Sequence, residues 1–395
     1  MKIYIIGFNS FIAKHLYISL KRLHTEIFLV SHNEIEKIQK INPDDIVINC
    51  CGVNRASTKE EYENGNYIFI QNLFKKLDES PYLIHLSSIM VYGFKNISND
   101  QLSDYQRWFI ETKLKGEHFL TENYNKDKLC ILRPSNVYGY DCIPYYNNLV
   151  STLVYEKIHK YNKVSKINKN CIRNMISVDS LVTKIADITL NKKTGIYNII
   201  SSNDMSLYQI VNYLYLNNDN NGIQFTDGEI NIINSSSDNI SGENIIITED
   251  FEVEIVKLEN SMKYYYSLLD IVTIKKIETL SQHRGDMVEI TDLLSNRLYK
   301  ITITPHSVRG NHYHYNQIED FYINSNKVLF LLALADFPDI IYFLPGNKND
   351  LVRINPYVIH TLSNDFLDNI SEIIISSTQK YIQNEVPDTK YINLI

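Results

Sequence analysis

The first part of the chain alternates short apolar runs with longer segments in which apolar residues recur every three or four positions. The apolar runs predict strands at residues 2–6, 26–30, 45–50, 82–87 and 128–132. The periodic segments predict one helix that ends near residue 23 and further helices at residues 67–77 and 107–123. Strands that alternate with helices in this way build a doubly wound parallel sheet, the Rossmann-like form of the α/β class.

This alternation continues to about residue 271, where a last helix is expected to end. Beyond it the pattern predicts only short strands, at residues 273–277, 285–290, 298–303, 321–323, 327–332, 340–343, 351–354 and 370–376. Closely spaced short strands are typical of a β jelly-roll barrel. We therefore predict two domains, an α/β domain at residues 1–271 and a β domain at residues 272–395.

Composition narrows the class of protein. The net charge is −7 with acidic and basic residues interspersed, which makes nucleic acid an unexpected partner. No apolar run is long enough to span a bilayer, and the first residues enter a strand directly instead of forming a signal peptide. The five cysteines form no Cys-x-x-Cys motif, which indicates free thiols and a reducing cytoplasm.

The turn after the first strand is where a doubly wound sheet holds the pyrophosphate of a dinucleotide against a helix N-terminus. The usual fingerprint has three glycines. Here only Gly7 remains, and the small residues Ser10 and Ala13 stand at the other two positions. Small side chains still permit close approach of the backbone to a cofactor. The alternative is a scaffold of the same fold that binds no cofactor.

A second candidate site lies in the predicted β domain. His312 and His314 are two residues apart and would point to the same face of a strand, and Glu319 could return to that face after a short turn. His360 offers a third imidazole on a later strand. Three histidines and one carboxylate suit zinc, iron, manganese or nickel. The alternative is that the paired histidines are ordinary exposed strand residues.

These four residues resemble the metal motif of the cupins. In that motif His-x-His is followed by Glu, and a later Pro-x-Gly-x-x-His supplies the last ligand. Glu319 fits, and so does the spacing from Pro356 to His360, although Val358 stands where the motif has glycine. The resemblance implies a cupin barrel with a metal site at His312, His314, Glu319 and His360.

Three segments of the first domain resemble extended short-chain dehydrogenase/reductases: residues 86–93, 109–117 and 132–139. The resemblance implies that Ser88 holds the substrate oxygen. It also implies a Tyr-x-x-x-Lys pair on the following helix, of which Lys113 is present but the tyrosine is replaced by Phe109. Phenylalanine cannot donate a proton, and a positioned acid is worth about two to four orders of magnitude in rate. Lys113 would then be either a remaining active-site residue or a surface lysine.

Tyr105 lies one helical turn before Phe109, on the same face as Lys113 if the helix begins that early. One turn displaces it by about 5.4 Å, which is too far for an unaltered mechanism. We therefore expect the reductase step to be weakened or absent.

The whole chain resembles the bifunctional UDP-sugar epimerase–reductases of capsular polysaccharide synthesis, on the path to UDP-N-acetyl-L-fucosamine. The most specific segments are residues 52–55 (Gly-Val-Asn-Arg) and 310–314 (Gly-Asn-His-Tyr-His). The resemblance implies a UDP-2-acetamido-2,6-dideoxy-4-ketohexose as substrate. A zinc-holding cupin would invert C3, and the first domain would reduce C4 with NADPH.

Further residues take their expected roles from this resemblance alone. The residues expected to contact the cofactor are Gly7, Ser10, Phe11, Ile12, Gly52, Asn54, Lys113 and Pro134. The residues expected to contact the substrate are Arg55, Asn136 and Asn147. The family analogy also implies a homodimer.

Three hypotheses follow from these observations. The chain could carry both activities, or it could be a cupin epimerase or ketoisomerase with a silent reductase domain. It could also be a non-catalytic paralogue that binds nucleotide sugar. Consumption of NADPH, and its rescue by Phe109→Tyr, separates the first hypothesis from the second. The third predicts neither metal binding nor solvent exchange at C3.

Overall fold

The computed structural model describes residues 1–395 except 25, 39, 78–80, 94–101, 203, 216–222, 228–230, 233–241, 283–284, 291–292, 295, 368–369 and 380–387. The chain divides into two compact units. Unit 1 holds residues 1–24 and 29–262, and unit 2 holds residues 25–28 and 263–395. This division falls inside a helix, between residues 262 and 263, whereas the sequence predicts a boundary after residue 271. The domain boundary at residue 271 therefore stays a prediction.

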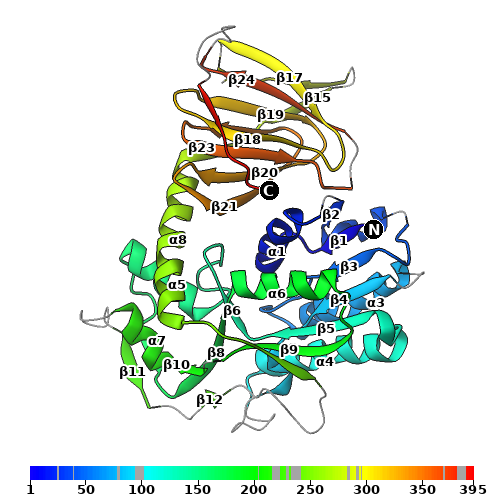
Figure 1. Ribbon diagram of the computed structural model, residues 1–395, viewed down its shortest axis with the longest axis vertical. Coiled ribbons are helices and arrows are strands. Elements are labelled where there is room, and N and C mark those ends of the chain that lie inside the picture. The colour runs from blue at the N-terminus through cyan, green and yellow to red at the C-terminus, as the bar shows by residue number, and fades with distance from the viewer. Residues whose placement is uncertain are drawn as a thin grey trace. The chain divides into compact units, whose positions relative to one another are not determined.

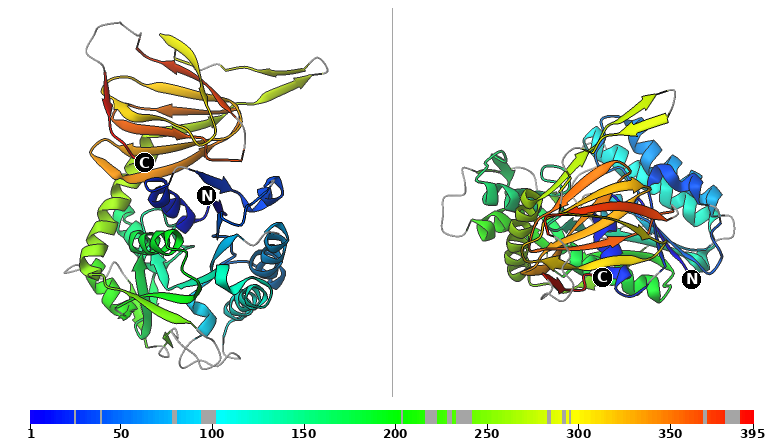
Figure 2. Two further views of the ribbon diagram at one scale, coloured as in Figure 1. Left: turned by 45° about the vertical axis from the view of Figure 1, so that its right-hand side comes forward. Right: turned by 90° about the horizontal axis from the view of Figure 1, so that it is seen from above.

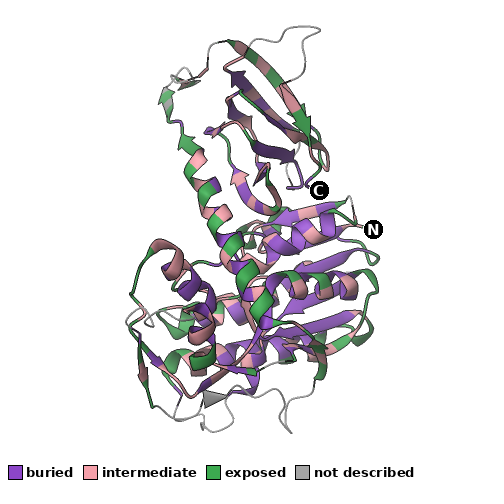
Figure 3. Cartoon of the chain, turned by 60° about the vertical axis from the view of Figure 1, so that its left-hand side comes forward, coloured by how far each residue is buried: buried purple, intermediate pink, exposed green. Residues whose placement is uncertain are grey.

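Unit 1 is built on a seven-stranded sheet in the order β13-β9-β5-β4-β3-β1-β2. The neighbouring pairs from β1 to β13 are parallel. The strands are β1 (Ile3–Ile6), β2 (Ile27–Val30), β3 (Ile46–Asn49), β4 (Tyr82–Leu86), β5 (Leu129–Pro134), β9 (Gly195–Ser201) and β13 (Glu243–Ile247). The central strands are buried along their whole length, as expected for a sheet covered on both faces (Figure 3).

The helices of unit 1 form two groups, which Figure 1 shows on opposite faces of the sheet. In one group α1 (Phe11–Lys21) packs against α6 (Val178–Leu190). In the other, α4 (Asp104–Asn123) packs against α2 (Lys59–Glu63), the π-helical turn η2 (Asn64–Ile68) and α3 (Phe69–Lys76). The chain order reverses beside β1, which makes the crevice at the carboxyl ends of β1 and β3 the expected ligand site.

Smaller elements complete unit 1. Short 3-10 helices follow β2, β4 and the end of α4, namely η1 (His32–Lys37), η3 (Ile89–Tyr92) and η5 (Lys126–Lys128). The strands outside the main sheet are β6 (Asn136–Tyr138), β7 (Lys166–Asn168), β8 (Cys171–Ser177), β10 (Asp204–Ser206), β11 (Gln224–Thr226) and β12 (Asn231–Ile232). The remaining helices are α5 (Leu149–His159), α7 (Leu207–Leu214) and α8 (Phe251–Ile271), and α8 runs from one unit into the next.

Unit 2 contains two antiparallel five-stranded sheets, with the orders β14-β22-β19-β24-β17 and β21-β20-β23-β18-β25 (Figure 2). The first sheet is built from β14 (Val272–Lys276), β17 (Arg297–Ile303), β19 (Glu319–Ser325), β22 (Asp350–Ile354) and β24 (Ser371–Ser377). The second is built from β18 (Val308–His314), β20 (Val328–Leu334), β21 (Phe337–Gly346), β23 (Val358–Ser363) and β25 (Thr389–Tyr391). A separate hairpin joins β15 (Thr279–Gln282) to β16 (Gly285–Val288).

The two sheets of unit 2 enclose one apolar core. Side chains from both sheets, among them Phe321, Phe330, Val352 and Leu362, form a single buried cluster. Alternate residues of β17 point away from this core and are exposed, which is the pattern of a half-buried antiparallel strand. The prediction of a Rossmann-like sheet followed by a β jelly roll is therefore confirmed.

Three further sequence expectations can be compared with the structure. The predicted strand and helix boundaries agree with the observed ones within a few residues for most elements, but several short strands, among them β13 and β25, were not predicted. All five cysteines are free thiols. Among the described residues, no helix combines the length and apolar character that crossing a membrane requires.

Candidate functional site

A pocket of about 810 Å³ lies in unit 1, where the strands β1, β3, β4 and β5 end. Its walls come from segments that follow these strands: residues 9–12, 50–56, 86–88 and 134–137. Helix α4 adds a fifth wall through Tyr105, Phe109 and Lys113. Parallel strands end at one edge of their sheet, so four segments far apart in sequence meet there.

The pocket brings together almost every residue that sequence analysis proposed for unit 1. The proposed residues that line it are Ser10, Phe11, Ile12, Gly52, Asn54, Arg55, Ser88, Phe109, Lys113, Pro134, Asn136 and Asn147. Gly7 is not part of the lining. It supports the turn from behind, because its φ is +82° and a Cβ there would lie 2.7 Å from Sγ of Cys51. Ser10 then caps α1 by accepting from the backbone N–H of Ala13.

The loop at residues 52–55 is held by one buried amide. Asn66 accepts from the backbone N–H of Val53 at 2.8 Å and donates to the backbone oxygen of Val53 at 3.0 Å. A Cβ at position 52 would come within 2.5 Å of Nζ of Lys113, so Gly52 allows the ammonium to approach the loop. The Gly-Val-Asn-Arg segment thus packs directly on the lysine of α4.

Other predicted residues also take part in fixing the pocket walls. Ser88 begins η3 and accepts from the backbone N–H of Met90 at 3.2 Å. Arg55 donates to the backbone oxygen of Tyr145 at 3.1 Å, and Asn136 donates to that of Asn174 at 3.1 Å. Asn147 accepts from the backbone N–H of Ile143 at 2.6 Å. These bonds orient the walls of the pocket.

The pocket wall also contains an ion pair that no pattern in the sequence indicates. Lys14 and Asp141 both line the pocket, and their charged groups are 2.8 Å apart. Neither residue belongs to a segment that the family resemblance singled out. They are separated by 127 positions, so only the folded chain brings them together.

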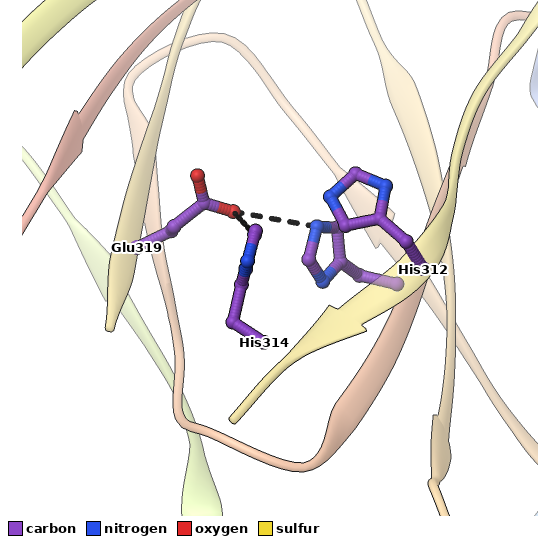
Figure 4. Close-up of side chains that lie close together, drawn as sticks. His312, His314 and Glu319 are labelled. Atoms are coloured by element: carbon purple, nitrogen blue, oxygen red, sulfur yellow. Dashed lines mark ion pairs between the residues drawn. The ribbon is translucent and has the colours of Figure 1, made fainter. Parts of the chain in front are cut away.

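In unit 2 the four predicted metal-ligating residues converge. His312, His314, Glu319 and His360 each offer one donor atom, and these atoms lie within 4.8 Å of one another. Strands β18, β19 and β23 supply them. Figure 4 shows Glu319 facing His314, with His312 on the far side of the group. We call this group the four-residue cluster.

A β-bulge places His312 in the cluster. The register of β18 against β23 shifts between Gly310 and His312, so that His312 lies opposite His360. Gly310 has a φ of +92°, and a Cβ there would collide with the backbone oxygen of His360 at 2.4 Å. Asn311 follows with a φ of 58°, a conformation that Asn tolerates better than most residues. The Gly-Asn pair is therefore the local cause of the register shift.

The cluster is buried and its charges are paired. His314, Glu319 and His360 are 9%, 3% and 2% exposed. One carboxylate oxygen, Oε2 of Glu319, lies 3.2 Å from Nε2 of His314 and 3.3 Å from Nε2 of His360. Burial acts to raise the pKa of Glu319, but the hydrogen bonds from the two imidazoles outweigh it and hold that pKa well below its usual range.

The pKa values of His312 and His314 move in opposite directions from that of a free imidazole. Burial and the neighbouring imidazoles lower the pKa of His312 to about 4. Burial also acts to lower the pKa of His314, but its hydrogen bond to Glu319 reverses the shift and raises it. A neutral His312 and an ionised Glu319 are the forms in which these side chains bind metals.

Hydrogen bonds to groups outside the four-residue cluster orient its donor atoms toward one another, as metal sites require. The other oxygen of Glu319, Oε1, accepts from Tyr299 at 3.1 Å and from Gln317 at 2.7 Å, which leaves Oε2 toward the imidazoles. Nδ1 of His360 lies 3.2 Å from the backbone oxygen of Val358, which leaves Nε2 facing the cluster. The donor set and its orientation therefore fit a divalent metal.

The model of the NAD dependent epimerase/dehydratase family matches residues 3–199, the segment that contains the pocket and most of its sheet. The match agrees with the extended short-chain dehydrogenase/reductase motifs, and unit 1, which contains most of the matched residues, is called the epimerase/dehydratase unit below. A search of the curated proteins found no match to the sequence.

Several solved structures are similar to the chain at low identity. MoeE5 in complex with UDP-glucose and NAD has 16% identity and a TM-score of 0.53, over 66% of this chain and 98% of its own. The UDP-N-acetylglucosamine 4-epimerase from Bacillus cereus has 16% identity and a TM-score of 0.51, over 67% of this chain and 96% of its own. These two support the fold of the epimerase/dehydratase unit. The capsular polysaccharide assembling protein CapF from Staphylococcus aureus matches 99% of this chain and 100% of its own, at 19% identity and a TM-score of 0.45.

Within the epimerase/dehydratase unit, Lys113 is 4% exposed, so the alternative of a surface lysine is wrong. Burial lowers its pKa to about 8, although Glu117 and Cys51 act in the opposite direction. Its Nζ lies 5.9 Å from the centroid of the Phe109 ring. Helix α4 begins early enough to include Tyr105, which is 55% exposed and lines the same pocket.

We expect Lys113→Met to stabilise the protein at pH 7, because it removes a buried cation. A pKa lowered from 10.5 to about 8 corresponds to a gain on the order of 3 kcal/mol in the free energy of unfolding. Between about pH 8 and 10.5 the folded lysine is neutral while the unfolded one is charged, so the parent protein regains this energy as pH rises.

Chemical denaturation of both proteins from pH 7 to 10.5 measures the difference. Lys115→Met on the same helix is the matched control, because Lys115 is exposed and paired with Glu63 and should not stabilise. A stability difference that does not shrink toward pH 10.5 would contradict the burial argument.

Proposed function

We propose that the chain is a nucleotide-sugar epimerase with an attached cofactor-binding unit. Its four-residue cluster binds a divalent metal, for which we propose zinc. This metal site catalyses C3 epimerisation of a UDP-2-acetamido-2,6-dideoxy-4-ketohexose. The pocket of the epimerase/dehydratase unit binds NADPH and the UDP-sugar, and C4 reduction there is slow or absent because position 109 lacks the tyrosine. The convergence of His312, His314, Glu319 and His360 carries this proposal.

The order of the two steps has a chemical reason. The C3 proton is acidic only while C4 is a carbonyl, because the carbanion is then stabilised as an enolate. A divalent metal in the cluster would supply Lewis-acid polarisation of a carbonyl oxygen. The protein contributes fixed geometry, since Tyr299 and Gln317 hold Glu319 in place and the surrounding strands bury the carboxylate.

The cofactor assignment rests on the family and on the pocket. NADPH would supply the hydride for C4. Ser88 would hold the substrate oxygen and Lys113 a ribose hydroxyl, while Phe109 would leave the nascent alkoxide without its usual proton donor. The structure of MoeE5 holds UDP-glucose and NAD, and we infer the same ligand classes for this pocket. Ser31 and His32 follow β2, so this position has neither the carboxylate that binds the ribose of NAD nor the arginine that binds the 2′-phosphate of NADP, and NADPH is proposed from the family resemblance alone.

The proposed function predicts metal-dependent exchange of the C3 proton with solvent. Proton NMR would follow the UDP-4-keto-6-deoxy-HexNAc in deuterated water, with zinc-loaded protein and with protein treated with a chelator. We expect deuterium at C3 with the loaded protein alone, and little consumption of NADPH. Restoring zinc to the chelated protein should restore exchange.

Other outcomes separate the alternatives. Formation of a C4 alcohol at a rate matching NADPH loss would establish both activities despite Phe109. Absence of exchange together with absence of metal binding would favour a non-catalytic nucleotide-sugar binder. A role in capsule synthesis, a cytoplasmic location and a homodimer remain predictions that follow from the family resemblance.

A further inference from the structure

The last residues of the chain reach back to the four-residue cluster. Strand β25 pairs with β18 in the register His312 with Tyr391, Tyr313 with Lys390 and His314 with Thr389. Two metal-ligating positions of β18 therefore have direct cross-strand partners in this C-terminal strand. Residues 388–394 are called the C-terminal strap below.

The C-terminal strap contacts Nδ1 of His314, the ring nitrogen that does not face Glu319. Nδ1 of His314 lies 3.0 Å from the backbone oxygen of Asp388 and 3.0 Å from Oγ1 of Thr389. A backbone oxygen only accepts, so the Nδ1 that faces it carries a hydrogen, and Nε2 is the nitrogen of His314 that is left for a metal. Nε2 is the atom that faces Glu319.

Asp388 is itself held in place. Its carboxylate accepts from the backbone N–H of Asn316 at 3.1 Å and from the Asn316 side chain at 3.0 Å. Both bonds go to the turn that follows β18, directly beyond His314. The backbone oxygen that faces His314 is therefore fixed by two side chains that are not themselves in the cluster.

The far end of the strap is anchored at the β-bulge. The backbone N–H of Ile392 donates to the backbone oxygen of Asn311 at 2.8 Å, and that of Leu394 donates to Oδ1 of Asn311 at 3.2 Å. Leu394 is 2% exposed. Between the two anchors the ring of Tyr391 lies edge-on to His312, with the ring centroids 5.5 Å apart. The strap thus contacts both histidines of β18 and the bulge that positions them.

We propose that the C-terminal strap is part of the metal site, where Thr389 acts as a positioning residue that orients His314 for metal binding. This inference rests on the proposed metal site and does not depend on which sugar is the substrate. The strap contributes no metal ligand of its own. It restricts the rotation of an imidazole that would otherwise have to be ordered when metal binds.

Outer contacts of this kind change metal affinity by about 10–100-fold in metalloproteins. We therefore expect Thr389→Val, which keeps the shape of the side chain but removes the hydroxyl, to raise the zinc dissociation constant about tenfold. Thr389→Ser keeps the hydroxyl and should stay within threefold of the parent. Asp388→Ala, which frees the backbone oxygen from its Asn316 anchor, should resemble Thr389→Val.

Three measurements on the full-length chain test this proposal. Competition with a chromophoric chelator gives the zinc dissociation constant, the visible absorption of the Co²⁺-loaded protein reports ligand geometry, and thermal unfolding of the metal-free protein reports fold stability. Thr302→Val, in the exposed face of β17, is the matched control and should change none of them. Thr389→Val should alter the first two while leaving metal-free unfolding close to that of the control.

The outcomes distinguish this inference from the proposed function. A zinc dissociation constant of Thr389→Val within threefold of the parent would overturn the positioning role, and so would a Thr389→Ser protein as weak as Thr389→Val. Parent protein that binds zinc but exchanges no C3 proton would end the proposed function while leaving the role of the strap intact. A parent protein that binds no metal would contradict both the proposed function and the role of the strap.

Discussion

Replacing Glu319 with glutamine should lower zinc affinity by at least about 100-fold and abolish exchange of the C3 proton. Even contacts outside the ligand set are worth 10–100-fold in metal affinity, and Glu319 is the cluster's one carboxylate. Glutamine keeps the shape and the hydrogen bond from Tyr299, but it removes the negative charge that faces His314 and His360. The loss should therefore appear in metal binding more than in folding.

The measurement pairs zinc competition with the deuterium exchange assay. Glu372→Gln is the control, since Glu372 lies on β24, pairs with Lys300 on β17 and is not in the cluster. Full exchange by Glu319→Gln, at a zinc dissociation constant like that of the parent, would contradict the assignment of this carboxylate as a ligand.

Replacing Phe109 with tyrosine should raise NADPH-dependent reduction of C4 by about two to four orders of magnitude. Phe109 lines the pocket and is only partly buried, so a hydroxyl can be added to the ring. Lys113 already lies beside that ring and is buried, which is the arrangement that lowers the pKa of a tyrosine acid. The substitution therefore restores the missing acid next to its expected partner.

Two variants check that the gain comes from the hydroxyl. Phe109→Leu changes the ring but adds no acid, and it should remain as inactive in reduction as the parent. Phe109→Tyr combined with Lys113→Met should lose most of the gain, because the ammonium no longer stabilises the phenolate. Equal NADPH consumption by parent and Phe109→Tyr would mean that another group already supplies the proton, and Tyr105 lines the same pocket.

The sequence predicted the type and order of most structural elements because their patterns are local. Residues 3–6, for example, form an apolar run, as expected for β1, which is buried on both faces, and this run is visible in the sequence without knowledge of its neighbours. Strand β13 was missed for the converse reason. It lies at the edge of the sheet, all of its residues are exposed or only partly buried, and it follows a long polar segment.

The sequence by itself determined which side chains are available for chemistry: the two histidines of β18, the carboxylate of Glu319, the lysine at position 113 and the phenylalanine at position 109. Their spacing along a strand or helix sets which of them share a face. It also showed that one pocket residue cannot act as an acid, since that depends on side-chain identity alone.

Only the tertiary structure decided how these side chains meet. His360 lies opposite His312 because a bulge at Gly310 shifts the register of two strands that are far apart in the chain. Lys113 is buried because the loop at Gly52 packs on it. Thr389 reaches His314 because β25 pairs with β18. Such pairings depend on closing long loops around a common core, and no local pattern of apolar and polar residues specifies them.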